Sequence, residues 1–86
     1  MKVHKAVLKV GLHPQRYLLS GPVVHMECRN DADIVEFWFL ADSEEERERW
    51  FDVFGTGQFF DPESWDYVAT AAHASGLVWH LLERKQ

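Results

Sequence analysis

Short apolar segments separated by turn residues most limit what this chain can fold into. They are Val3–Val10, Arg16–Leu19, Val23–Arg29, Ile34–Ala41, Asp66–His73 and Leu77–Leu82. Several short strands at close spacing, with turn punctuation between them, are typical of an antiparallel sheet. We therefore predict one small, mainly β domain over residues 1–86, with a sheet that curls into a sandwich or barrel. A helical contribution is limited to one or two short turns, near residues 43–48 or 62–66.

The pattern within two segments predicts which side chains face the core. In Val23–Arg29 the alternate residues Val24, Met26 and Cys28 are all apolar, so this set is expected to point inward. A thiol buried there has a raised pKa and is inert. Ile34–Ala41 is the most apolar segment, which predicts a central strand covered on both faces.

Residues 43–54 fit two structures. Ser43 and Glu46 have capping-box spacing, and the residues between Glu44 and Trp50 are good helix formers. The next residues also suit a strand, with Arg49, Phe51 and Val53 on one face. Local propensity favours a short helix. Further along, the loop Ala74-Ser75-Gly76 between two apolar runs predicts a β-hairpin.

The aromatic content is high for a chain of 86 residues. Aromatic residues make up 14% of the chain and include four Trp and six Phe. A small domain cannot bury all of these rings, which favours an interface with a partner or with a second copy. If the strand alternates, Trp50 points away from Phe51 and Val53, which makes Trp50 a candidate binding residue.

Charge and cysteine content set the expected partners and compartment. The net charge is −5 and no Lys/Arg cluster is present, which disfavours nucleic acid. The single cysteine, Cys28, allows no intrachain disulfide, as is usual in a reducing cytosol. The first ten residues do not form a signal peptide, and no apolar run has bilayer-spanning length. We expect a cytoplasmic protein that does not bind membranes.

No group of residues predicts catalysis, a metal site or a cofactor. The five histidines lack the spacing of a helical metal site. His25 and His80 could meet if their strands pair, which the sequence leaves open. The serines lie in turns without a nucleophile-elbow pattern. We expect no enzymatic activity.

The triplet Gly55-Thr56-Gly57 is the one motif that could hold a phosphate. It lacks the third glycine of a dinucleotide fingerprint and the Lys of a phosphate-binding loop, and no convincing helix follows it. A turn or bulge that needs positive φ is therefore favoured over a phosphate cradle.

The order of these features resembles a family of short phage and prophage proteins that have no assigned activity. The matching residues are Lys2, Lys5, Ser20-Gly21-Pro22, Val24 to Asn30, Trp38, Asp42, Arg49, Phe51, Val53, Phe54-Gly55-Thr56-Gly57, Tyr67, Thr70 and Gly76 to Leu81. The triplet and the Val78-Trp79-His80 strand are the most specific part. Gln58 departs from the family, whose members usually have His there, and this puts in doubt any site that needs that imidazole.

The resemblance implies a strand through Arg49–Phe54 in place of the helix, and expression in an infected or lysogenic bacterial cell. Our leading hypothesis is a non-catalytic phage accessory protein that binds a host protein or assembles with itself as a homo-oligomer. The alternative is a protein that sequesters a small nucleotide signal in antiphage defence. In that case the triplet's amides and Arg49 or Arg16 would hold phosphate while a Trp stacks on the base. The candidate binding residues are Arg49, Trp50, Gly55, Thr56, Gly57 and Gln58.

Overall fold

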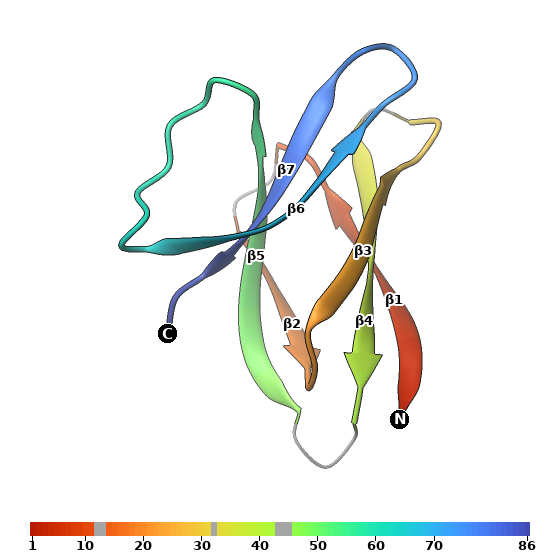
Figure 1. Cartoon of the computed structure of the whole chain (residues 1–86), viewed down its shortest axis with the longest axis vertical. Coiled ribbons are helices and arrows are strands. Elements are labelled where there is room, and N and C mark those ends of the chain that lie inside the picture. Colours follow the sequence, from red (N-terminus) through yellow and green to blue (C-terminus); the bar gives the residue numbers. More distant parts are fainter. Residues whose placement is uncertain (12–13, 32, 43–45) are drawn as a thin grey trace.

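A computed structural model describes residues 1–11, 14–31, 33–42 and 46–86. Within these ranges the strands are β1 (Lys2–Lys9), β2 (Gln15–Leu19), β3 (Val23–Cys28), β4 (Ile34–Ala41), β5 (Arg47–Gly55), β6 (Trp65–Ala72) and β7 (Val78–Arg84). They form two antiparallel sheets, ordered β1-β4-β3 and β2-β5-β7-β6 (Figure 1). The sheets pack as a small β-sandwich and do not close into a barrel, so the predicted fold class is confirmed.

Of the two predicted helical turns, the one near residues 62–66 is present as a single isolated turn, whereas strand begins at Arg47 within the other. Pro62–Ser64 form a turn in which the amides of Ser64 and Trp65 both donate to Asp61 O at 3.0 Å. Ser43, the first residue of the capping box, lies outside the described residues. From Arg47 onward the chain is strand β5, because burial of alternate residues in the core outweighs local helix propensity. The described ranges contain no helix of the length and apolar character needed to cross a membrane.

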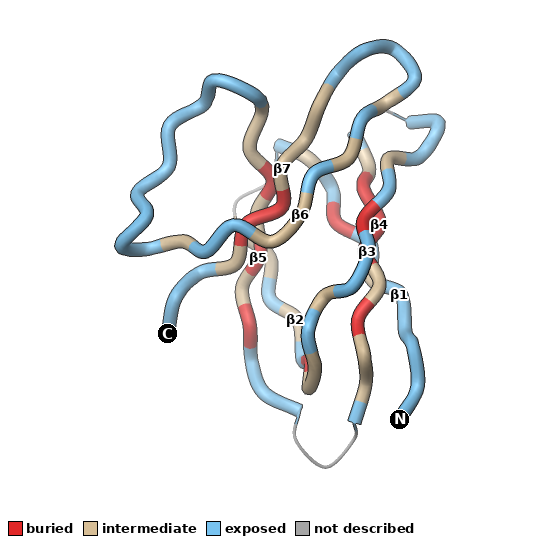
Figure 2. Tube along the Cα trace, viewed as in Figure 1, coloured by how far each residue is buried: buried red, intermediate tan, exposed pale blue. Residues whose placement is uncertain are grey.

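The core lies between the two sheets, where Figure 2 shows the buried segments. Phe37 of β4 and Phe51 of β5 are both fully buried, and their ring centroids are 5.0 Å apart. Tyr17 of β2 places its ring edge-on against both, at 5.4 and 5.8 Å. Leu8 and Leu81, also fully buried, extend this layer. The predicted hairpin is formed by β6 and β7.

The expected inward set of β3 is only partly correct. Met26 is 4% exposed and Cys28 packs against the core, but Val24 is 52% exposed. The register shifts between Val23, which pairs with Phe39, and His25, which pairs with Trp38. An extra residue at such a bulge reverses the direction of the side chains that precede it. Val23 therefore packs against the core and Val24 points to solvent.

The outer face of β4 also differs from the expectation. β4 is the central strand of its sheet, as predicted, but only one face packs against the other sheet. On the outer face Glu36 forms ion pairs with Lys5 (2.6 Å) and Arg29 (2.9 Å). The hydrogen bond from Lys5 is the main cause of the lowered pKa of Glu36.

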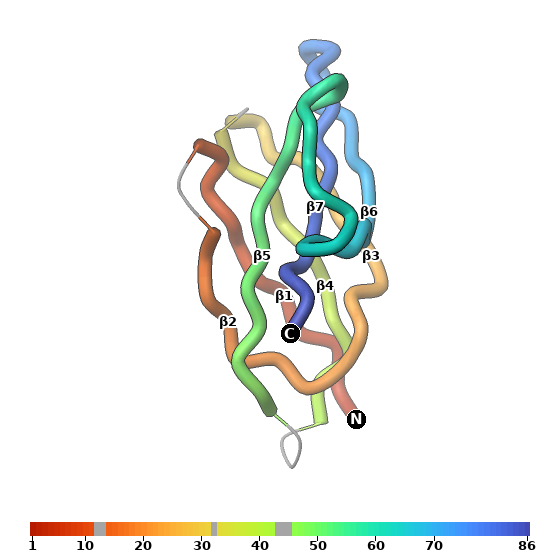
Figure 3. The backbone as a smooth tube through the Cα atoms, turned by 90° about the vertical axis from the view of Figure 1, so that its left-hand side faces the viewer, coloured from red at the N-terminus to blue at the C-terminus, as the bar shows by residue number. Residues whose placement is uncertain are grey.

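Side-chain bonds join the two sheets along both seams, which Figure 3 shows as β2 beside β1 and β6 beside β3. On the first seam the Tyr17 hydroxyl donates to Val7 O at 2.6 Å, and Gln15 Nε2 donates to Lys9 O at 2.9 Å. On the second seam Cys28 Sγ lies 3.6 Å from Ala71 O. Burial raises the pKa of Cys28, as predicted for a structural thiol.

Tyr17 makes the fold less stable at alkaline pH. Burial raises the pKa of Tyr17 from 10.0 to about 12. Between these values the unfolded chain ionises this phenol while the folded chain does not, so stability is lost as pH rises from about 10 to 12. We expect Tyr17→Phe to reduce this loss, measured by urea unfolding at pH 9 and pH 11.5. Equal losses in the two proteins would contradict the assignment.

Candidate functional site

The triplet Gly55-Thr56-Gly57 forms the turn that ends β5. Gln58 N donates to Gly55 O at 3.0 Å, and Gly57 has a φ of +88°. The Gln58 side chain closes the turn from the other direction, since its Oε1 accepts from Gly55 N at 3.1 Å. The predicted turn is confirmed. The Gly55 and Gln58 amides are therefore already bonded within the turn.

The turn forms one wall of a pocket of about 200 Å³ on the outer face of the four-stranded sheet. The lining residues are Phe54, Gly55, Thr56, Gly57, Gln58, Phe60, Tyr67 and His80. They come from the end of β5, the loop after it, β6 and β7. Antiparallel pairing places Phe54 opposite His80, and Thr70 opposite His80 on the other side. The pocket therefore depends on strand pairing between distant segments.

A chain of hydrogen bonds fixes the polar side of the pocket. His80 Nε2 lies 2.8 Å from the Thr56 hydroxyl, and His80 Nδ1 lies 2.8 Å from the Thr70 hydroxyl. The Thr70 hydroxyl also bonds the Tyr67 hydroxyl. A neutral imidazole donates through one nitrogen and accepts through the other, so both of its bonding positions are used here. In this arrangement His80 orients the wall of the pocket.

Half-buried and exposed rings cover the same face of the sheet beside the pocket. Phe54 contacts Phe60 and Trp65 edge-on, at centroid distances of 6.0 and 5.7 Å. Leu82 is fully buried on this face, paired with Asp52 and Tyr67 of the neighbouring strands, and lies outside the cluster between the sheets. We call the rings on this face, Trp50, Phe54, Phe60, Trp65 and Tyr67, the outer aromatic cluster. The high aromatic content thus serves a second apolar layer as well as the core.

Trp50, a predicted binding residue, belongs to this cluster but is half-buried rather than exposed. The Arg84 guanidinium lies between two rings, 5.1 Å from Trp50 and 5.7 Å from Trp65. Trp50 Nε1 donates to Glu48 at 3.0 Å. Glu48 also pairs with Arg16 at 2.8 Å, and this bond is the main cause of the lowered pKa of Glu48.

Arg49 does not lie with the other predicted site residues. It points to the opposite face of β5, is 5% exposed, and forms a two-bond ion pair with Glu83 at 2.6 and 2.7 Å. It also donates to Gly21 O. Arg49, predicted as a ligand-binding cation, is therefore paired inside the fold and does not line the pocket.

Sequence reasoning selected Gly55, Thr56, Gly57 and Gln58, which do line the pocket, but missed its aromatic walls. Alternation in β7 places His80 on the opposite face from buried Leu81, and this pattern in the sequence could have indicated that His80 lies on the outer face. The facing of Tyr67 could not be read in the same way, because a register shift between Tyr67 and Ala69 breaks the alternation of β6. His25 and His80 do not pair, since they belong to different sheets.

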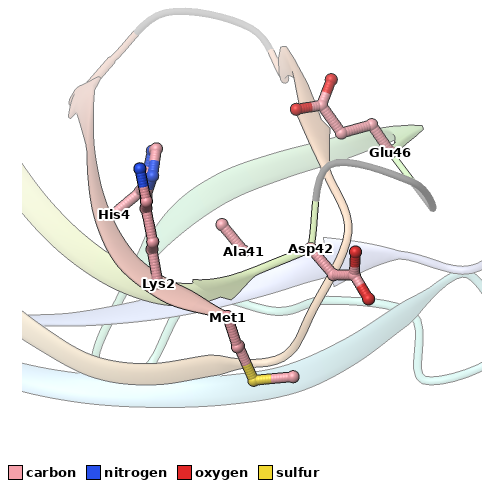
Figure 4. Close-up of a pocket in the computed structure, with 6 residues that line it drawn as sticks. All are labelled: Met1, Lys2, His4, Ala41, Asp42 and Glu46. Atoms are coloured by element: carbon pink, nitrogen blue, oxygen red, sulfur yellow. The ribbon is translucent and has the colours of Figure 1, made fainter.

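A second pocket, of about 270 Å³, lies where β1 begins and β4 ends (Figure 4). It is lined by Met1, Lys2, His4, Ala41, Asp42 and Glu46. The carboxylates of Asp42 and Glu46 point in different directions in Figure 4. In the described part of the chain no three His, Cys, Asp or Glu residues are grouped closely enough to hold a metal ion.

Comparison with known proteins gives a family but no activity. No curated protein and no solved structure matches the chain. A family model described as a domain of unknown function (DUF7352) matches residues 1–86, the full length of the sequence. The chain therefore belongs to the DUF7352 family.

Proposed function

We propose that this protein is a small non-catalytic binding protein that recognises another protein through the outer aromatic cluster and its pocket. The observation that carries the proposal is the exposure of large apolar side chains around one pocket. Phe59 is 97% exposed, Tyr67 58% and Phe60 39%. Aromatic side chains that pay little conformational entropy on binding are the usual anchors of protein interfaces.

The expected partner follows from the resemblance to phage and prophage proteins. On that basis we propose an accessory protein that acts in the cytoplasm of a bacterial host cell and binds a host protein. The acidic net charge of −5 supports a protein partner over nucleic acid.

The alternative, a nucleotide-sequestering protein, keeps one supporting observation. Phe54, Phe60 and Tyr67 could stack on a base. The phosphate would lack Arg49, which is paired with Glu83, and the amides of Gly55 and Gln58, which are bonded within the turn. A thermal-shift screen with linear and cyclic nucleotides separates the two: stabilisation by a nucleotide, lost in Tyr67→Ala, would favour the alternative.

The proposal is tested by capture from a bacterial host lysate, followed by binding with the purified candidate partner. We expect Tyr67→Ala to weaken the affinity for that partner about tenfold or more, because this ring is an exposed wall of the pocket. Isothermal titration calorimetry measures the affinity.

The matched control is Val24→Ala, which removes a comparably exposed apolar side chain from the other sheet. It should bind the purified partner as the wild type does. A partner whose affinity is unchanged by Tyr67→Ala, or equally reduced by Val24→Ala, would contradict the proposed surface.

A further inference from the structure

The loop between β5 and β6 carries a protruding ring directly beside the pocket. Residues 56–64 are all exposed, and Figures 1 and 2 show this loop extending outward from the body of the sandwich. Within it Phe60 packs against Phe54 and lines the pocket, whereas its neighbour Phe59 is 97% exposed. One short segment thus presents both an apolar projection and part of an apolar hollow.

We propose that a second copy of this chain covers this surface, with Phe59 of each protomer inserted into the pocket of the other. This inference rests on the surface proposed above and makes a second copy, in place of a host protein, the occupant of its pocket. In a two-fold dimer each contact occurs twice, with the roles of the two chains exchanged. Because Phe59 and the pocket lie side by side on one chain, two copies can each supply one ring and one pocket to the same two-fold interface.

The dimensions of the pocket suit a phenyl ring. An apolar protein cavity of about 150 Å³ holds a benzene molecule, and this pocket has about 200 Å³. The walls formed by Phe54, Phe60 and Tyr67 offer ring faces and edges to an entering ring. The pocket has no formally charged group among its lining residues, so inserting a phenyl ring buries no unpaired charge.

Edge-to-edge pairing of strands is the other route to self-association, and the structure opposes it at β1. Lys2, Lys5 and Lys9 lie along this edge strand, and lysines on an edge oppose pairing with another chain. The carbonyls of Val7 and Lys9 already accept bonds from β2. The second edge of that sheet, β3, lies against β6. The face with the pocket is therefore the better site for a second copy.

A dimer through this face needs a surface of ordinary interface size. A standard interface buries about 800 Å² on each partner, about one seventh of the 5587 Å² of this chain. The rings of the outer aromatic cluster and the projecting loop lie together on this side. Because the contact is apolar, we expect added salt to leave it intact, although salt would weaken an assembly held by charge.

Analytical ultracentrifugation of the purified chain tests the inference. We expect a reversible dimer whose dissociation constant rises about 100-fold or more in Phe59→Ser, because each dimer loses two buried anchors. Val24→Ser is the matched control on the opposite face and should dimerise as the wild type does. Since Phe59 is exposed, Phe59→Ser should keep the melting temperature of the wild-type monomer.

Cross-linking provides a second readout of position. In a Cys28→Ser background, mixing a Phe59→Cys chain with a Tyr67→Cys chain should give an oxidised heterodimer, since the inserted residue lies against the partner's pocket wall. Neither chain alone should cross-link as efficiently. Efficient cross-linking of both single chains, with none between the two, would overturn the proposed arrangement.

The outcomes separate this inference from the proposed function. A wild-type chain that stays monomeric, or a dimer unaffected by Phe59→Ser, would overturn the second copy as occupant. Binding of a purified host partner that Tyr67→Ala abolishes would still support the proposed surface. Unchanged dimerisation in Phe59→Ser together with unchanged partner binding in Tyr67→Ala would contradict both.

Discussion

Replacing Arg49 by methionine should lower the free energy of unfolding by about 3–5 kcal/mol, because removing one member of a buried ion pair leaves the other charge without compensation. Arg49 and Glu83 have side chains only 6% and 17% exposed, and two hydrogen bonds join them. The Gly21 carbonyl would lose its donor as well. Urea unfolding of the wild type and Arg49→Met measures the loss.

The double variant Arg49→Met/Glu83→Leu is the decisive control. Replacing both members of a buried ion pair by apolar residues is often neutral or stabilising. We therefore expect the double variant to recover most of the stability lost in Arg49→Met. Losses that add, as if Arg49 and Glu83 acted independently, would contradict the assigned pairing. With the fold restored, partner binding should match the wild type, since neither side chain lines the pocket.

The close packing around Gly21 accounts for the hydrogen bond from Arg49 to the Gly21 carbonyl. A Cβ on Gly21 would lie 2.1 Å from the carbonyl oxygen of Leu40, far inside contact distance. Only glycine permits this approach of the β2–β3 connection to β4. The approach also turns the Gly21 carbonyl toward the guanidinium. Arg49 thus ties one sheet to the connection that leads into the other.

Local pattern was enough to predict most of the strands. For β5 the local pattern favoured a helix and the family resemblance implied the strand, but the alternation within that strand correctly places Phe51 and Val53 on one buried face. The hairpin of β6 and β7 follows from one glycine-containing loop, in which Gly76 has a φ of +99°. These features depend on residues that are close in sequence, so the sequence alone specifies them.

The site depended on contacts that local pattern does not contain. Arg49 shares its face of β5 with Phe51, and its partner Glu83 lies 34 residues away. Without knowledge of the β5–β7 pairing, the sequence offers Arg49 as a candidate ligand-binding cation. The bulge at Val24 could not be predicted from local pattern either, because a register shift depends on the neighbouring strand. Pairing between strands therefore decides which of the predicted residues meet.

The outer aromatic cluster shows how composition can predict a surface without locating it. Four Trp and six Phe in a small chain indicated that some rings would stay partly exposed. Phe37 and Phe51 fill the space between the sheets, while Phe54 and Trp65 lie on the outer face. Alternation along β5 places Phe51 and Phe54 on opposite faces of the strand. Only the folded structure shows that Trp65 packs beside Phe54.

Phe37 and Phe59 give the sharpest contrast between a ring that stabilises the fold and a ring available for binding. Phe37 is fully buried and contacts the rings of Tyr17 and Phe51. We expect Phe37→Ala to cost about 3–5 kcal/mol, the sum of lost transfer energy and the cavity left behind. A domain of this length has a total stability of about 4–13 kcal/mol. Phe37→Ala should therefore unfold at much lower urea concentration.

The matched variant Phe59→Ala removes the same side chain from a position that is 97% exposed. At a concentration low enough for the chain to be monomeric, we expect it to change the free energy of unfolding by no more than about 0.5 kcal/mol. At high concentration the wild type should gain stability from dimerisation and Phe59→Ala should not, since association stabilises only the folded state. A large loss in the monomeric Phe59→Ala chain would mean that this ring belongs to the fold. Stability that is independent of concentration in the wild type would argue that no second copy covers the pocket.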